Sequence, residues 1–439
     1  MQLRLENNII FQTKFVPVKI AHRIAPRKKA HILIEESQQT FDKILKWAQQ
    51  FPLISALNSN NHMVEYGQHE WLIAVGEKAL SFGGTAFDEL YNHWEENRDW
   101  LFGQLAYDLK NTVEDLESNN PDHHQNPDIH FFIPETVFEF DGKQLVISCK
   151  NGNPDLVWKS VNSCQSTVDG ERWTVGLQPT LTREEYLEKI KMLQEHIQLG
   201  DIYEVNFCQE FVAENAEIEP TEMYAVLNKK TRAPFSVFQK NNEHFLFSGS
   251  PERYLKKSGN KVISQPIKGT ARRSQHQAED LEIKTVLENS VKERAENVMI
   301  VDLVRNDLSI TAADNTVEVE ELFGVYTFPT VHQLISTVSA EIHEASNWGE
   351  VLKYSFPMGS MTGAPKVSAM QLIEKYETFK RGLFSGAVGY INPNGDFDFN
   401  VVIRSILYNA NTKYLSAPVG GAITILSDPE EEYEECLLK

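Results

Sequence analysis

Strand patterns joined by tight turns recur along this chain and constrain its fold more than any other feature. At residues 136–148, two strand-like runs flank Asp141-Gly142, a pair that tolerates the positive φ of a hairpin turn. Because strands joined in this way pair antiparallel, the sequence predicts antiparallel sheets. Similar patterns occur at residues 236–248, at residues 254–265, around Asn394-Gly395 and around Asn411.

Helical patterns separate these strands. The clearest helix begins at Thr182, where Thr182 and Glu185 match a capping box, and ends at Gly200, which suits a left-handed C-terminal stop. A polar stretch at residues 151–170 precedes it and is a plausible boundary. Apolar residues at helical spacing predict four further helices, at residues 39–50, 86–94, 278–305 and 367–376.

The charge balance limits the possible partners. The 439 residues carry a formal net charge of −20, so we expect binding to neither nucleic acid nor an anionic membrane. An anionic substrate would need a local reversal of sign, by a metal cation, backbone amides or a few Arg and Lys side chains. No apolar run approaches 18 residues, and the four cysteines show no zinc or redox spacing. We therefore expect a cytoplasmic protein.

A single lysine in the run QPIKGT, residues 265–270, is the first candidate for chemistry. Pro266 fixes its own φ and lacks an amide donor, while Gly269 leaves room for close approach, so Lys268 is held on a stiff strand end without a local partner. A lysine nucleophile near pH 7 needs a pKa lowered from about 10.4 by roughly 3 units, about 4 kcal/mol. The alternative is an ordinary lysine of a surface strand.

Two acidic pairs are candidates for a metal site. Glu293 and Glu296 are three residues apart on a predicted helix and so share one of its faces, and Glu432 and Glu435 repeat that spacing near the C-terminus. Facing each other, the pairs would form an oxygen-rich site suited to Mg²⁺. Each pair alone is also compatible with a solvated helix.

Further features point to anion binding. Residues 356–366, FPMGSMTGAPK, precede a helix whose N-terminal amides could receive an anion, although the spacing does not fit a phosphate loop. Arg404 lies in an apolar strand pattern and requires a carboxylate from the protein or from a ligand. Gly420-Gly421 would let backbone amides approach a carboxylate. By contrast, His123 and His124 lie in a polar loop and are expected to be solvated.

Together these stretches resemble the chorismate-utilising enzymes. The resemblance spans roughly residues 182–436 and implies an α+β fold with large antiparallel sheets packed face to face and helices outside. Residues 1–175 then form a variable N-terminal region that contributes to the same sheets, and residues 180–439 form the chorismate-binding catalytic region. The matching blocks, in order, are GDIYEVN (200–206), SPER (250–253), PIKGT (266–270), AENVMIVDLVRNDLS (295–309), GSMTGAPK (359–366), SGAVGY (385–390), VVIRS (401–405), and GGAIT followed by SDPEEEYEE.

The resemblance also implies a reaction. PIKGT is similar to the family members that aminate chorismate at C4, the aminodeoxychorismate synthases, whereas anthranilate synthases look like PIAGT. It implies that Lys268 adds to C2 of the ring while Glu252, as general acid, helps the C4 hydroxyl to leave. Ammonia then attacks C4 and expels the lysine, which gives 4-amino-4-deoxychorismate, a precursor of para-aminobenzoate and folate. Mg²⁺, held by Glu296 and Glu435 with Glu293 and Glu432 nearby, would bind the ring carboxylate.

The substrate contacts and the partner follow from the same resemblance. His332 matches a family histidine near the ring, with a satisfied core histidine as the alternative. No cysteine lies in a G-x-C-x-G turn, so a separate glutamine amidotransferase is expected to supply ammonia. Glu204 departs from the glutamine usual in the aminating members and has no assigned role. The remaining implied substrate contacts are Gly269, Thr270, Tyr390, Arg404, Gly420, Gly421 and Ala422.

Two other functions remain open on these residues. The first is anthranilate synthase component I, from which Lys268 separates this chain. The second is a non-catalytic, Mg²⁺-dependent metabolite-binding protein that keeps the scaffold. The retention of Lys268, Glu252 and both acidic pairs argues against that second function.

Overall fold

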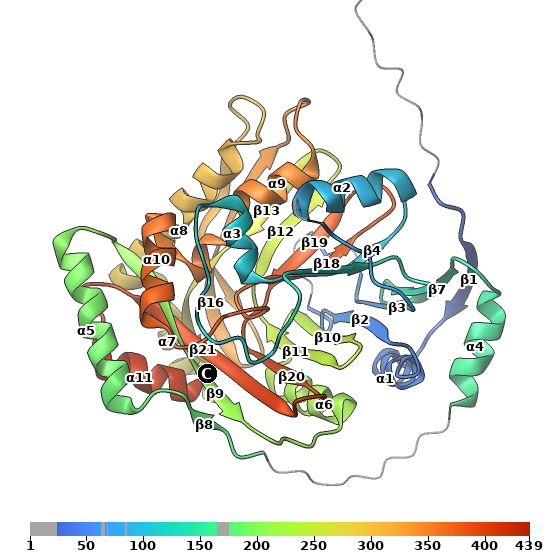
Figure 1. The fold of residues 1–439 in the computed structure, drawn as a ribbon, viewed down its shortest axis with the longest axis horizontal. Helices are drawn as coiled ribbons and strands as arrows, with labels where there is room; N and C mark the ends of the chain where they lie inside the picture. The colour runs from blue at the N-terminus through green and yellow to red at the C-terminus, as the bar shows by residue number, and fades with distance from the viewer. Residues whose placement is uncertain (1–23, 63–65, 68, 84–85, 165–174) are drawn as a thin grey trace, which may run out of the picture.

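The strand–turn–strand patterns fold as antiparallel hairpins within two large sheets (Figure 1). The structure is a computed structural model that describes residues 24–62, 66–67, 69–83, 86–164 and 175–439. The hairpin predicted at 136–148 pairs β6 (Thr136–Phe140) with β7 (Gln144–Cys149), and its turn places Gly142 at a φ of 97°. All strand pairs of the two sheets in the described residues are antiparallel, as the hairpins predict.

The first sheet joins strands from both ends of the chain. β2, from the N-terminal part, pairs directly with β10, so both parts form one sheet. The sheet has 12 strands, and short β8 (Gln178–Pro179) pairs with β9 beside the main path. Its order is β1 (Lys28–Leu33), β7, β6, β3 (Trp71–Gly76), β2 (Leu53–Asn58), β10 (Phe235–Asn241), β11 (His244–Ser250), β20 (Ser405–Asn409), β21 (Tyr414–Ile423), β9 (Glu204–Ala213) and β17 (Gly363–Ala364).

The second sheet is built in the same way. β4 pairs with β18, so this sheet also combines early and late segments of the chain. It has nine strands, and β15 (Glu318–Thr327) pairs with β16 beside the main path. Its order is β14 (Ile267–Arg272), β16 (Val331–Glu341), β13 (Lys261–Gln265), β12 (Arg253–Ser258), β19 (Phe397–Val401), β18 (Ala387–Ile391), β4 (Leu101–Leu105) and β5 (Ile129–Phe132).

The two sheets pack face to face around a shared apolar core. Val237 and Leu246 of the first sheet belong to the same buried cluster as Leu255, Val338 and Phe399 of the second. Burial of this apolar surface is the main favourable contribution to the stability of such a sandwich. The predicted α+β fold with face-to-face antiparallel sheets is therefore confirmed.

Helices cover the outside of the sheets (Figure 1). The capping box at Thr182 and the left-handed Gly200 bound α5, as the sequence predicts. Around the first sheet lie α1 (Ser37–Ala48), α4 (Pro154–Ser163), α5 (Arg183–Leu199), α6 (Pro220–Thr231), α10 (Lys366–Tyr376) and α11 (Pro429–Leu438). Around the second lie α2 (Ala86–Asn97), α7 (Gln277–Asn289), α8 (Val291–Ser309) and α9 (Trp348–Ser355). The shortest helices of the described residues are η1 (Tyr107–Leu109), α3 (Lys110–Val113) and η2 (Gly359–Met361).

One helix prediction needs correction. The single helix expected at 278–305 is two helices, α7 and α8, which meet at Ser290. Ser290 has an extended backbone, and its side chain accepts a hydrogen bond from the Glu293 amide, so it caps α8. This break sets the direction of α8 and thus of the face that carries Glu293 and Glu296.

Two expectations fall partly outside the described residues. The boundary expected at 151–170 overlaps α4 at one end, and its other end lies in residues 165–174, which are not described. The N-terminal residues 1–23 are likewise outside the described part. Among the described residues, no helix combines the length and apolar character needed to span a bilayer.

Candidate active site

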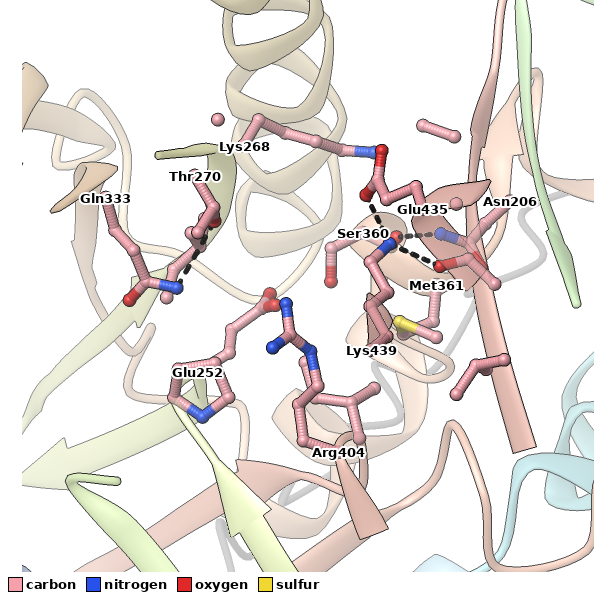
Figure 2. A pocket seen from close by; sticks show the side chains of 18 of the residues that line it. Asn206, Glu252, Lys268, Thr270, Gln333, Ser360, Met361, Arg404, Glu435 and Lys439 are labelled. Carbon is pink, nitrogen blue, oxygen red and sulfur yellow. Dashed lines mark hydrogen bonds and ion pairs between the residues drawn. The ribbon is translucent and has the colours of Figure 1, made fainter. Parts of the chain in front are cut away.

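A cavity of about 400 Å³ collects most of the residues singled out in the sequence (Figure 2). Its walls come from β14, β21, α8 and α11, together with the loops before β12 and after β19. All the predicted site residues except His332 and Tyr390 line it. They are Glu252, Lys268, Gly269, Thr270, Glu293, Glu296, Arg404, Gly420, Gly421, Ala422, Glu432 and Glu435.

Lys268 extends from β14 into this cavity, but it has a partner. The side chain is buried, with 8% of the residue exposed, and its Nζ lies 2.7 Å from Oε1 of Glu204 on β9. Burial alone would lower the pKa of Lys268, but the negative charges of Glu204, Glu296 and Glu252 outweigh it and raise the pKa above its usual value. The expectation of a lowered pKa for this lysine is therefore wrong, and its partner comes from a segment distant in the sequence.

Gly269 brings the lysine strand close to the first acidic pair. Its φ of 95° is in the left-handed region, and a Cβ added there would lie 3.0 Å from Oε2 of Glu293. A side chain at this position would therefore be strained and would crowd the carboxylate of Glu293. The glycine of the PIKGT run thus shapes the cavity wall beside Lys268.

Glu252 lies between β11 and β12 and is also buried, with 5% of the residue exposed. Its backbone carbonyl accepts a hydrogen bond from the Val401 amide, which fixes the loop to β19. Burial raises the pKa of Glu252 to about 7, so the carboxyl group can carry a proton near neutral pH. Such a group can act as a general acid.

The two acidic pairs line the same cavity without closing on one point. In the described part of the chain, no three His, Cys, Asp or Glu side chains already form a cluster that could hold a metal ion. Ammonium groups hold the pair on α11: Lys292 Nζ lies 3.8 Å from Glu432 Oε1, and Lys439 Nζ lies 2.6 Å from Glu435 Oε1. The two acidic pairs thus share one cavity, but their carboxylates do not converge on one point as the sequence predicts.

The carboxylates nevertheless fit a divalent cation. Among the described residues, Oε1 of Glu296 is buried and has no hydrogen-bond partner, and burial raises the pKa of this carboxyl group to about 7. A buried carboxylate oxygen without a donor is stabilised by a bound cation, and hard oxygen ligands suit Mg²⁺. The site therefore fits Mg²⁺, with Glu296 as its best-placed ligand.

The same cavity also offers groups for an anion. Arg404 follows β19 with a φ of 51° and is partly buried, and the structure places no carboxylate within ion-pair distance of it among the described residues. Of the two partners that the sequence left open for Arg404, a protein carboxylate and a ligand carboxylate, the structure thus favours the ligand carboxylate. Gly420 and Gly421 of β21 also line the cavity. A Cβ on Gly421 would lie 3.0 Å from Oε2 of Glu432, so glycine keeps this wall open.

The cavity differs from the rest of the molecule in its charge. The whole chain is strongly acidic, but the lining has equal numbers of basic and acidic side chains. Burial also raises the pKa of both Glu252 and Glu296 to about 7, which reduces the negative charge further. A bound divalent cation would then favour a dianionic ligand. The basic residues of the lining are Lys268, Arg272, Lys292, Arg404 and Lys439, and the acidic ones are Glu252, Glu293, Glu296, Glu432 and Glu435.

A buried ion pair supports the floor of the cavity. Arg381 donates to Glu377 within a fully buried pair, and it also donates to the backbone carbonyls of Met361 at 2.7 Å and Asn206 at 2.8 Å. Met361 and Asn206 both line the cavity. Arg381 therefore fixes two segments that are distant in sequence.

We expect Arg381→Met to destabilise the protein by about 3–5 kcal/mol, because it leaves Glu377 buried without its cation. The free energy of unfolding in urea measures this effect. The double variant Arg381→Met, Glu377→Met should recover most of the loss, since it removes the stranded charge. Equal destabilisation in both variants would show that the pair matters only for packing.

Two predicted substrate contacts lie outside the cavity. Both ring nitrogens of His332 have partners, Thr327 at 3.0 Å and Asp280 at 3.1 Å, which is the core arrangement considered as the alternative. Tyr390 is buried between the sheets and stacks on Phe102, with ring centroids 5.8 Å apart. Neither side chain is part of the cavity lining.

Two further sequence expectations change. Lys366, at the start of α10, forms a partly buried ion pair with Asp307 at 2.6 Å, and this helix start does not line the cavity. The same turn-rich run instead contributes Ser360 and Met361 to the lining. His124 is buried and contacts Ser416 Oγ at 2.7 Å, so only His123 is the exposed histidine expected in this loop.

Sequence reasoning missed some groups at the cavity. Asn206 lines it from β9, two residues after Glu204, and alternation along a strand places both on one face. This two-residue alternation was the signal in the sequence that could have predicted Asn206 as a site residue. Lys292 and Lys439 also line the cavity, and each is close to one acidic pair in sequence, within one or four residues. Nothing in their spacing distinguishes them from solvated lysines.

Comparisons with known proteins show the family of this chain. A family model described as chorismate binding enzyme matches residues 29–439. The aminodeoxychorismate synthase component 1 of Escherichia coli strain K12 is 36% identical over 335 residues, which covers 76% of this chain and 73% of that protein. The anthranilate synthase component 1 of Aquifex aeolicus is 32% identical over 359 residues, covering 77% and 72%.

Solved structures share the fold. Anthranilate synthase component I of Streptococcus pneumoniae TIGR4 superposes with a TM-score of 0.72 at 22% identity, covering 100% of this chain and 94% of that one. The menaquinone-specific isochorismate synthase of Escherichia coli gives a TM-score of 0.75 at 16% identity, covering 94% and 93%. At these identities the similarity establishes the architecture alone.

Proposed function

This chain belongs to the chorismate-binding enzymes, and on that basis we propose that it aminates chorismate at C4 to give 4-amino-4-deoxychorismate. The observation that carries the proposal is the buried amine of Lys268 inside a cavity that also holds a protonatable Glu252 and the two acidic pairs. A relative whose name states this activity is 36% identical to the chain over 335 residues. This assigns the enzyme to para-aminobenzoate and folate synthesis.

In the proposed reaction, Lys268 is the nucleophile. Its Nζ adds to C2 of the ring, the double bond shifts, and the C4 hydroxyl leaves as water with a proton from Glu252. Ammonia then attacks C4, the bond between C2 and Nζ breaks, and Lys268 recovers its electron pair. Splitting one substitution into two steps in this way is the general advantage of covalent catalysis.

The remaining groups of the cavity bind and orient the substrate. Glu296 and Glu435 would hold Mg²⁺, with Glu293 and Glu432 beside them. When bound, the ion would neutralise the ring carboxylate and withdraw electrons from the ring. Arg404 would pair with the second carboxylate, and the backbone of Gly420, Gly421 and Ala422 would approach it. Gly269 and Thr270 complete the wall beside the lysine.

Ammonia would come from a partner. The relatives in Escherichia coli and other bacteria are named component 1, which fits a second component. None of the four cysteines here lies in a nucleophile turn of the glutaminase type. We therefore assign the release of ammonia from glutamine to a separate amidotransferase subunit.

A pH profile tests the role of Glu252. Because the proton must be present before it can be donated, we expect kcat/KM for chorismate to fall about tenfold per pH unit above a pKa near 7, at fixed free ammonia and saturating Mg²⁺. Glu252→Gln should lower the rate about 10²–10⁴-fold and remove this falling limb. An unchanged limb in the variant would assign the acid to another group.

The product itself tests the function. The purified chain is incubated with chorismate, Mg²⁺ and an ammonium salt at alkaline pH, and products are identified by mass and absorbance. We expect 4-amino-4-deoxychorismate as the main product. Anthranilate or isochorismate as the main product would refute the assignment, and chorismate binding without turnover would favour a binding protein.

A further inference from the structure

We propose that Glu204 is a further catalytic residue, the base that takes the proton of Lys268 before the amine attacks and returns it after the product leaves. This inference rests on the proposed function, since it concerns the activation of the same nucleophile. Glu204 contacts the reacting atom directly, with Oε1 2.7 Å from Nζ of Lys268. It has no assigned role among the contacts considered so far.

The surroundings of Glu204 favour proton exchange with the lysine. Only 1% of the residue is exposed, and among the described residues its second oxygen, Oε2, is buried without a hydrogen-bond partner. A free acceptor oxygen leaves room for a proton on the carboxyl group. The charges that raise the pKa of Lys268 keep the pair ionised while water has access to the cavity. Once bound chorismate excludes water, an amine beside a carboxylic acid avoids the desolvation cost of two buried ions, so transfer within the pair becomes easier.

The backbone fixes Glu204 at this place. It begins β9 and pairs with Ala364 of β17, and the amide of the preceding Tyr203 donates to the Ala364 carbonyl at 2.7 Å. Two residues later, Asn206 lines the cavity, and alternation along β9 places Glu204 on that same face of the strand. The carboxylate is thus held on a rigid strand opposite β14, as a group that must meet one nitrogen atom requires.

Other charged groups act on the lysine, but the proposed reaction gives them other roles. Glu296 of α8 and Glu252 of the loop before β12 both act on Lys268 through their charge. The proposed reaction uses Glu296 for the cation and Glu252 for the departing hydroxyl. Of the carboxylates that act on Lys268, Glu204 alone has a hydrogen bond to Nζ among the described contacts.

The proton balance closes with this assignment. The lysine ammonium gives one proton to the Glu204 carboxylate, and the free amine forms the bond to C2 while Glu252 protonates the leaving hydroxyl. After ammonia has attacked C4, the bond from Nζ to C2 breaks and Lys268 leaves as a neutral amine. The new ammonium at C4 gives a proton to Glu252, and Glu204 returns its proton to Lys268. Chorismate and ammonia become 4-amino-4-deoxychorismate and water.

The test compares pH profiles of Glu204→Gln and the wild type. In the wild type the proton stays within the pair, so we expect kcat at saturating ammonia to depend little on the ionisation of Lys268. In Glu204→Gln the proton must leave for solvent, so kcat should be about 100-fold below wild type at pH 6, and the ratio of the two rates should approach one by pH 9. Glu204→Asp, which keeps a carboxylate, should retain the wild-type shape of the profile.

A matched control lies on the same strand. Glu210 is also a buried glutamate of β9, but it accepts a hydrogen bond from Tyr414 and is not among the groups that act on Lys268, so Glu210→Gln should leave the profile unchanged. A Glu204→Gln profile parallel to wild type, or a variant faster at every pH, would overturn the proposal, because Glu204 would then only hold the ammonium.

A second readout does not depend on turnover. Cyanate carbamylates neutral amines, and peptide mass spectrometry without chorismate follows the labelling of Lys268. In the enzyme without chorismate the ion pair keeps the proton on Lys268, so we expect faster labelling at pH 7 in Glu204→Gln than in wild type; equal rates would overturn the pairing on which the proposal depends. If the wild type made no 4-amino-4-deoxychorismate while this labelling difference persisted, the proposed function would be refuted, but the pairing of Glu204 with Lys268 would stand.

Discussion

Lys268→Ala is expected to abolish the amination of chorismate, with a loss of kcat of about 10⁴-fold or more, because it removes the atom that forms the covalent bond. Chorismate should still bind, since Arg404 and the backbone of β21 remain in the cavity. Steady-state rates with ammonia measure the first effect, and equilibrium dialysis with chorismate measures the second. Undiminished turnover would remove the covalent step from the mechanism.

A second substitution separates chemistry from folding. Lys268→Ala leaves Glu204 buried without its cation, which by itself destabilises a protein. Lys268→Arg keeps a positive charge beside Glu204, but a guanidinium stays protonated and cannot attack the ring. We expect Lys268→Arg to unfold at nearly the wild-type temperature and to be as inactive as the alanine variant.

Glu296→Gln is expected to lower activity about 10²–10³-fold and to lower Mg²⁺ affinity at least about tenfold. Its carboxylate has the buried Oε1 without a hydrogen-bond partner among the described residues, and an amide would bring a neutral group to the cation. Titration calorimetry with Mg²⁺ measures the affinity without reference to turnover.

The control for this variant is on the same helix. Asp302→Asn changes a carboxylate of α8 that is exposed and pairs with Arg305, so it should alter neither Mg²⁺ affinity nor rate. Retention of wild-type Mg²⁺ affinity in Glu296→Gln would contradict the assignment of Mg²⁺ to Glu296 and Glu435.

Much of the fold could be predicted because local signals agree with the long-range pairing. Asp141-Gly142 specifies its turn by its own backbone preference, and Thr182, Glu185 and Gly200 mark both ends of α5 in the sequence itself. The residues of the cavity could be predicted for another reason. They lie in short runs of glycine, lysine and paired glutamates whose chemistry is visible before the fold is known.

What could not be predicted depends on contacts between distant segments. The partner of Lys268 is 64 residues away, and only the fold brings Glu204 to it, so the direction of the lysine pKa was wrong in the sequence analysis. Tyr390 shows the same limit. A strand tyrosine can face either side of its sheet, and here it faces the buried core beside Phe102.

The central claim is that the amine of the buried Lys268 forms a covalent bond to the ring of chorismate. Intact mass spectrometry tests this claim most directly. The protein is mixed with chorismate and Mg²⁺ without ammonia, quenched, and digested to locate any added mass. We expect an increase equal to chorismate less one water, on the peptide that contains Lys268, and its loss when ammonia is added before the quench. Continued production of 4-amino-4-deoxychorismate with no adduct on Lys268, or with the added mass on another residue, would contradict the account.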